Sequence, residues 1–409
     1  MHVGAGPGVR TGSGSSDPLH LLAATPVPPW SVPFAAVPMA ASSDPGGPDH
    51  TGDLRSQVID AGRAAGLAAI GIGSGDILGA TREDLEARRK DGLHAGMQFT
   101  YRNPVRSTDP SRIVAGARSL IVGAWSYRRS EAAASEIDHG SRPNVPRGRV
   151  ATYARTDHYA ELRAGLGRVA SVVVDAGWKA KVVVDDNALV DRAAAHRAGL
   201  GWFGRNSLLL LPGRGSWCLL GSVVTDAPLE PTPPAGPTGH AQGCGTCTRC
   251  MTACPTGALS VAGVLDARRC LAWLVQAPGS IPVEHRVAMG DRIYGCDDCQ
   301  EVCPINRLGD RRHEAPAAEA EQLDHLDLFD LLATSDEEML ATYGRWYVAE
   351  RDPRYLRRNA LVAIGNVGDP SDPDTLATLE RWTVSDDALL AEHAQWALDR
   401  LDHRGRGGS

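Results

Sequence analysis

The feature that most constrains this chain is a cluster of cysteines. Eight of its nine cysteines fall between Cys244 and Cys303. The first four stand in the run C-x2-C-x2-C-x3-C-P, which bacterial ferredoxins use to bind 4Fe–4S clusters. Such clustering indicates metal binding rather than a secreted disulfide framework, and it fits a reducing compartment. The spacing therefore predicts an iron–sulfur module that carries electrons one at a time.

Two clusters need eight thiolates, and the chain offers eight near one another. Three more cysteines stand downstream in C-x2-C-x3-C-P, and the last lies in Arg-Arg-Cys-Leu. In the ferredoxin arrangement the fourth cysteine of a run crosses to the other cluster. The predicted ligands of one cluster are Cys244, Cys247, Cys250 and Cys303, and those of the other are Cys254, Cys270, Cys296 and Cys299.

Zinc is the alternative metal for these cysteines, because C-x2-C pairs are also common in tetrahedral zinc sites. Zinc sites rarely take three successive cysteines at this spacing and a fourth before proline, so iron–sulfur clusters are favoured. Cys218 lies in the strand-like Ser-Trp-Cys-Leu-Leu and fits no ligand spacing. We expect it to be a buried core thiol.

The overall charge excludes broad nucleic-acid affinity. The chain has 409 residues and a formal charge of −7, so any contact with nucleic acid would come from a local basic patch. No apolar run is long enough to span a bilayer. The segment that begins at Ala35 faintly resembles a signal cleavage site, but prolines break the stretch before it. We expect a monomeric, cytoplasmic protein without membrane contact.

The first half of the chain is predicted to form an α/β domain. Residues 1–53 are rich in Gly, Pro and Ser and are expected to be a disordered leader. Helices and strands then alternate over residues 54–227. The expected helices are Leu54–Ala65 and Tyr159–Ala176, and the expected strands are Ala68–Gly73, Ser119–Trp125, Lys181–Asp185 and Cys218–Thr225. Residues 228–240, with five prolines, are expected to be a stiff linker.

The second half is predicted to hold the ferredoxin-like two-cluster module at residues 241–314 and an all-α domain at residues 315–403. Helix pairs of the expected size resemble HEAT-type stacking, in which each pair hides its apolar face against the next. The expected helices are Leu323–Ala333, Glu337–Tyr343, Tyr355–Val367, Asp374–Trp382 and Asp386–Leu401.

The stretch Arg292-Ile-Tyr-Gly-Cys-Asp-Asp-Cys-Gln-Glu-Val-Cys-Pro resembles the epoxyqueuosine reductase family, which completes queuosine synthesis in tRNA. Other similar stretches occur in the family's order from about residue 90 to residue 370. They are Gly116-Ala-Arg-Ser-Leu-Ile-Val, Gly148-Arg-Val-Ala-Thr-Tyr-Ala-Arg, Val184-Asp185, Ala198-Gly-Leu-Gly-Trp-Phe-Gly-Arg-Asn-Ser, Gly215-Ser-Trp and Arg357-Arg-Asn-Ala-Leu-Val-Ala-Ile-Gly-Asn.

The resemblance implies an α/β cobalamin-binding domain, a module with two 4Fe–4S clusters, and a HEAT-like domain that helps to grip tRNA. The implied reaction removes the epoxide oxygen of epoxyqueuosine at the wobble position, with a flavodoxin or ferredoxin as external electron donor. The family's segment after the fifth ligand differs here, where Cys270 leads to Trp273-Leu-Val-Gln-Ala-Pro. That difference leaves the substrate open.

The resemblance also implies roles for single residues. Asp185 would be the proton donor, although Asp186 stands where relatives carry a small residue and could share the role. A solvated acidic pair at a strand end is the plain alternative, and an ordinary surface loop is the alternative for residues 101 and 102. The implied cofactor-binding residues are Tyr101, Arg102, Asp185, Gly201, Trp202, Asn206, Ser207, Gly215, Ser216 and Asp297.

Five arginines form the candidate tRNA patch, with aromatic residues between them that could stack on unpaired bases. They are Arg345, Arg351, Arg354, Arg357 and Arg358. The alternative is an ordinary exposed face paired with Glu350 and Asp352. Two other functions fit the cysteines: a corrinoid iron–sulfur reductase of another substrate, such as an organohalide, and an electron carrier whose α/β domain only docks a partner.

Overall fold

The computed structural model describes residues 49–127, 145–237, 241–312 and 324–407. Most of the predicted leader therefore lies outside the described residues. Its last five residues, however, belong to helix α1 (Asp49–Ala64), which begins earlier than the expected start at Leu54. In the described part of the chain, no helix is both long and apolar enough to cross a bilayer.

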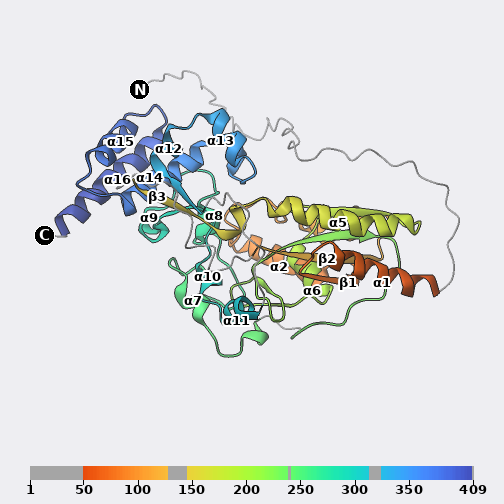
Figure 1. The fold of residues 1–409 in the computed structure, drawn as a ribbon. Coiled ribbons are helices and arrows are strands. Elements are labelled where there is room, and N and C mark those ends of the chain that lie inside the picture. The colour runs from red at the N-terminus through yellow and green to blue at the C-terminus, as the bar shows by residue number, and fades with distance from the viewer. Residues whose placement is uncertain (1–48, 128–144, 238–240, 313–323, 408–409) are drawn as a thin grey trace, which may run out of the picture. The chain divides into compact units, whose positions relative to one another are not determined.

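A four-stranded sheet organises the first half of the chain (Figure 1). The strands follow one another across the sheet in the order β1-β2-β7-β4, and every neighbouring pair is antiparallel. The four predicted strands are confirmed to within one residue at either end. They are β1 (Ala69–Ser74), β2 (Ser119–Ser126), β4 (Ala180–Val184) and β7 (Cys218–Thr225).

Helices cover both faces of this sheet. On β2, Ile121 packs with α1 and α5 (His158–Asp175), whereas its neighbour Leu120 packs with α6 (Asp191–Arg197) on the other face. This double burial explains why β2 is a continuous apolar run in an antiparallel sheet. At Gly71 a Cβ would lie 2.2 Å from the carbonyl oxygen of Ala198, so glycine lets the end of α6 touch the sheet.

A second sheet joins three segments that are far apart in the sequence. Its central strand β3 (Arg147–Val150) runs parallel to β8 (Arg292–Tyr294) and antiparallel to β9 (His325–Asp327). The prediction of a helix from Leu323 was therefore wrong at its start, and residue 323 itself lies outside the described residues. Leu326 is buried opposite Gly148 of β3. This pairing with a distant segment makes residues 325–327 a strand and not the first turn of a helix.

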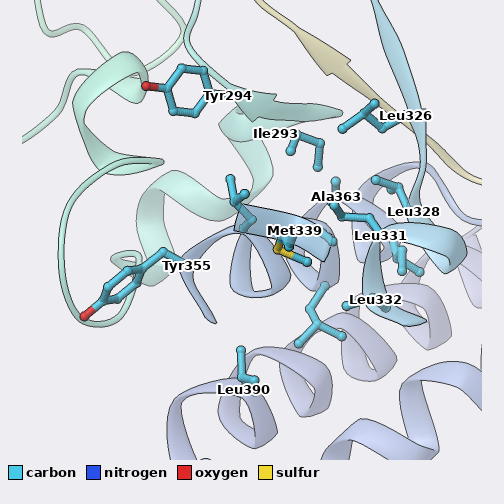
Figure 2. Packing of buried hydrophobic residues seen from close by; sticks show 14 of the residues in the cluster. Ile293, Tyr294, Leu326, Leu328, Leu331, Leu332, Met339, Tyr355, Ala363 and Leu390 are labelled. Carbon is cyan, nitrogen blue, oxygen red and sulfur yellow. The ribbon is translucent and has the colours of Figure 1, made fainter. Parts of the chain in front are cut away.

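The remaining C-terminal helices are confirmed, and they share one hydrophobic core with the second sheet. Ser335 and Glu338 form a reciprocal capping box at the start of α13, and Asp372 caps α15 ahead of its first proline. Figure 2 shows buried side chains of β8, β9, α12, α14 and α16 meeting in one core. The helices are α12 (Leu328–Ala333), α13 (Asp336–Tyr343), α14 (Arg354–Val367), α15 (Pro373–Thr383) and α16 (Ala388–Gly407).

The cysteine-rich segment has little regular structure and relies on its neighbours. Leu274 and Met289 pack with Val362 of α14, and residues 228–237 lie along the first sheet, where the Thr232 amide donates to the Ile72 carbonyl oxygen at 2.8 Å. The helices of the segment are short: α7 (Arg249–Ala253), α8 (Leu271–Leu274), α9 (Val283–Met289), α10 (Asp298–Glu301) and α11 (Pro304–Arg312).

Candidate functional site

The eight clustered cysteines fall into two groups by their mutual electrostatic interactions. In the first group, burial and the neighbouring thiols of Cys244, Cys303 and Cys247 raise the pKa of Cys250 to about 11. In the second group, Cys270 interacts with Cys254, and Cys299 interacts with Cys296 and Cys270. An interaction between Cys299 and Cys250 links the groups. The partition agrees with the two predicted ligand sets, whose assignment to clusters stays a prediction.

Backbone amides surround several of these sulfur atoms. The Ala258 amide donates to Cys254 Sγ at 3.2 Å. Cys303 and Cys270 each stand just before a helix, and amides of the first turn lower the pKa of each thiol against the larger rise from burial. Donors so placed favour a thiolate, which is the form that binds iron.

No three His, Cys, Asp or Glu side chains of the described residues converge on a single metal ion. A cubane takes one thiolate for each iron, so its ligands encircle the cluster and do not meet at one point.

A cavity of about 750 Å³ opens beside the end of β4. Its wall combines apolar side chains such as Leu85, Met97 and Leu265 with charged ones. Of the ten predicted cofactor-binding residues, Tyr101, Asp185 and Ser207 line it. This size and this mixed lining are typical of cofactor sites.

Asp185 is held at this wall by an unusual backbone conformation. It follows the last residue of β4 and has a φ of 52°, the left-handed region that a non-glycine residue rarely adopts. Its neighbour Asp186 accepts a hydrogen bond from the Ala188 amide at 2.8 Å and so builds the turn. Both carboxyl side chains line the cavity.

The electrostatic surroundings of Asp185 favour its acid form. Burial by surrounding protein raises its pKa, while Arg163 and Arg351 lower it and Asp186 raises it. The residue is still exposed to water in the open cavity, and we expect that water to screen part of the effect. A ligand that expelled the water would strengthen all these interactions.

Two cavity residues were missed by the sequence analysis, Asp191 and Arg192. Asp191 Oδ1 is buried without a hydrogen-bond partner, and burial raises the pKa of this carboxyl well above its usual range. Arg192 donates to the Ser207 carbonyl oxygen at 2.8 Å and also interacts with the thiol of Cys270. The second cysteine group therefore adjoins the cavity wall. The sequence signal that could have identified them is their position: they begin α6, the first helix after Val184-Asp185.

The glycine-rich loop contacts the first cysteine group. It forms the hairpin of β5 (Trp202–Phe203) and β6 (Leu209–Leu210). A Cβ on Gly243 would lie 2.1 Å from Trp202 Nε1, and Arg205 donates to the Gly245 carbonyl oxygen at 2.8 Å. Gly201, Trp202 and Asn206 are absent from the cavity lining, and so is Arg102.

Gly215, Ser216 and Asp297 belong to a buried polar network outside the cavity lining. The Ser216 amide donates to Asn306 Oδ1 at 2.7 Å, and its hydroxyl donates to Gln300 Oε1 at 3.0 Å. Asp297 accepts from the Thr152 amide at 2.7 Å. A Cβ on Gly215 would lie 2.0 Å from Asn306 Oδ1, so glycine is needed for this close approach. The network fastens the start of β7 to the cysteine-rich segment.

The predicted arginine patch is largely committed to internal contacts. Arg358 is 1% exposed and donates to backbone carbonyl oxygens of Leu274 and Ala277, both at less than 3 Å. Arg345 donates to the Ala154 carbonyl oxygen, and Arg354 pairs with Asp352. The prediction that Arg358 belongs to the tRNA patch was wrong, because Arg358 fills the core between α14 and α8.

Residues 243–306 match the family model for a 4Fe-4S double cluster binding domain. The chain is 36% identical over 357 residues to the epoxyqueuosine reductase of Xanthomonas campestris pathovar campestris, covering 86% of this chain and 97% of that protein.

Two solved structures, about equally similar to this chain, belong to the same family. One is an epoxyqueuosine reductase with a tRNA-Tyr epoxyqueuosine-modified tRNA stem loop; it is 29% identical, with a TM-score of 0.75, and the match covers 86% of this chain and 91% of that one. The other is the epoxyqueuosine reductase of Bacillus subtilis with a catalytic aspartate loop swung out of the active site; it is 27% identical, with a TM-score of 0.74, over 86% of this chain and 91% of that one.

Proposed function

Because the chain belongs to the epoxyqueuosine reductase family, we infer that it removes the epoxide oxygen of epoxyqueuosine in tRNA to give queuosine. The observation that carries this inference is similarity along almost the whole length of a family member, joined to a double-cluster module. The chain is therefore an oxidoreductase with iron–sulfur clusters.

We propose that electrons pass through the two cysteine groups to the cavity. The groups interact through Cys250 and Cys299, and the second group meets the cavity wall where Cys270 interacts with Arg192. Loss of an epoxide oxygen takes two electrons, and clusters deliver electrons singly. Two clusters in series, ending beside the cavity, suit that requirement.

We propose Asp185 as the acid that protonates the departing oxygen. Asp185 and Asp186 both line the cavity, but burial raises the pKa of Asp185, and Asp186 accepts a hydrogen bond within the turn. The catalytic aspartate of the Bacillus subtilis enzyme also lies on a loop, which supports this choice. A carboxyl shielded from water can hold its proton near neutral pH and release it during the reaction.

We propose that the cavity binds cobalamin, as the family resemblance implies. The residues fit such a group: apolar walls suit the faces of a flat macrocycle, and polar side chains such as Tyr101 and Arg192 suit its amide rim. When bound, cobalamin supplies low-valent cobalt, a strong reductant. The chain's own residues would orient it, exclude water, and hold the proton at the Asp185 carboxyl.

We also propose that the C-terminal helices are HEAT-like and contribute to tRNA binding, and that the division into domains is as predicted. The support is the layered packing of α14, α15 and α16, together with the stem-loop complex of a relative. With the arginine patch mostly internal, the tRNA contacts would come from other residues of these helices. A tRNA substrate implies a cytoplasmic enzyme.

The test is to reconstitute the protein anaerobically with iron, sulfide and cobalamin and to supply a reductant and epoxyqueuosine-containing tRNA. Nucleoside analysis should show queuosine. If the clusters are reduced and cobalamin is retained but no queuosine forms, the substrate assignment is wrong. Zinc in place of iron and sulfide in the purified protein would remove the electron path.

A further inference from the structure

The first cysteine group lies closer to the surface than the second. Around Cys244, Cys247 and Cys250, the chain neighbours Gly245, Thr246, Thr248 and Arg249 are all exposed. Around Cys270, Cys296 and Cys299, the neighbours Leu271, Gly295, Asp297 and Gln300 are buried, Asp298 is half-buried, and Arg269 is exposed. Electron tunnelling weakens steeply with distance, so an external donor has to approach the first group.

Positive charge lies near this first group. Arg249 begins α7 beside Cys250 and has no ion-pair partner among the described residues, and Arg307 is exposed on α11 beyond Cys303. Arg205 reaches the Gly245 carbonyl oxygen from the hairpin. Glu301, an exposed acid nearby in the sequence, pairs with Arg149 at 3.4 Å.

The local charge runs against that of the whole chain. The segments 203–216, 241–255 and 303–309 contain four arginines and no acidic residue, in a chain whose formal charge is −7. Fields of this kind steer oppositely charged partners toward a surface and raise association rates by roughly 10- to 1,000-fold.

We propose that the surface defined by Arg205, Arg249 and Arg307 docks an acidic one-electron carrier protein, which reduces the first cluster. The carrier loses one electron and the cluster gains it, and no proton or group moves. The proposal rests on the proposed function only in taking the first cysteine group to hold a cluster. tRNA, the other polyanion, has to bring its modified base to the cavity at Asp185 and does not need to reach the first group.

The experiment measures cluster reduction without tRNA. Reduced bacterial flavodoxin, an acidic carrier, is mixed anaerobically with the reconstituted full chain, and bleaching of the visible cluster absorbance is followed by stopped flow. The test variant carries Arg249→Glu and Arg307→Glu. The matched control carries Arg63→Glu and Arg406→Glu, which change the net charge equally at exposed sites on α1 and α16. Iron and sulfide content and the EPR spectrum establish that both variants hold their clusters.

At low salt we expect the second-order rate constant of the test variant to fall by about tenfold or more, with the control near wild type. The difference should shrink toward 1 M salt, where the Debye length is about 3 Å. Reduction by dithionite should differ much less among the proteins. The proposal is overturned if the carrier reduces the test variant at the wild-type rate at low salt. It is also overturned if the test variant loses only its affinity for the tRNA stem loop. A wild-type protein without iron and sulfide would instead contradict the proposed function.

Discussion

At the scale of single residues, the strained position of Asp185 bears most directly on function. Six non-glycine residues among those described have positive φ, and Asp185, Ser207 and Arg351 among them lie on or interact with the cavity wall. Each such residue costs roughly 1–3 kcal/mol, which the surrounding fold has to offset. Strain gathered at one cavity supports the interpretation that the cavity is the reaction site.

Asp185→Asn should abolish turnover and leave the clusters intact. The amide keeps the size of the side chain but has no acidic proton to give, and loss of a general acid typically costs about 10²- to 10⁴-fold in kcat. Queuosine formation, measured against iron content and visible spectrum, checks this. Asp186→Asn is the matched control and should retain most activity, because an amide oxygen can still accept from Ala188. The reverse pattern would move the acid role to Asp186.

The pH profile should depend on Arg351. Only the protonated carboxyl can donate, so kcat should fall as the pH rises through the pKa of Asp185. The positive charge of Arg351 lowers that pKa. Arg351→Met removes the charge and should therefore raise the pKa and move the descending limb to higher pH. The exposed Arg354, changed to Met, serves as the control. An unmoved limb in Arg351→Met would show that Asp185 does not govern it.

At the scale of helices and strands, the buried Arg358 joins α14 to the cysteine-rich segment. Its guanidinium donates to the carbonyl oxygens of Leu274 and Ala277. Arg358→Met should lower the free energy of unfolding by about 3 kcal/mol, since buried acceptors lose their donors. Thermal unfolding of the reconstituted protein measures the loss. The exposed Arg354→Met should change little, and equal effects of the two variants would contradict the assigned role of Arg358.

Helices and strands with a long, regular pattern of apolar residues could be predicted from the sequence. Short elements that depend on a distant pairing partner could not. Four elements have enough regularly spaced apolar residues to be recognised: the strands β2 and β7 and the helices α5 and α14. Strand β9 has three residues, and only its pairing with β3 makes it a strand.

The same limit applied to the candidate site. Cysteine spacing predicted the two groups because ligand spacing is local, and Asp185 was predicted from the resemblance of Val184-Asp185 to the family's element. The cavity neighbours Asp191 and Arg192 and the burial of Arg358 depend on tertiary packing, which no local pattern records. The contact between the glycine-rich hairpin and the first cysteine loop is of the same tertiary kind, so the sequence did not indicate it.

At the scale of the whole molecule, the cysteine-rich segment and the C-terminal helices share one core. The described residues group as a single unit by their contacts, and Leu271, Leu274 and Met289 pack with Val362 in the middle of α14. The segment itself has only short helices, so its shape has to come from the metal clusters and from this packing.

Removal of the clusters should therefore loosen the C-terminal helices as well as the cysteine loops. A chelator under oxidising conditions strips the iron, and unliganded thiols such as Cys296, whose pKa burial raises to about 12, then take up protons. Hydrogen exchange followed by mass spectrometry should show faster exchange in the cysteine loops and also in α14. Exchange in α5 should stay nearly unchanged, because the hydrophobic core between α5 and the first sheet contains no residue of the cysteine-rich segment. Unaltered protection of α14 would mean that the helical core stands without the clusters.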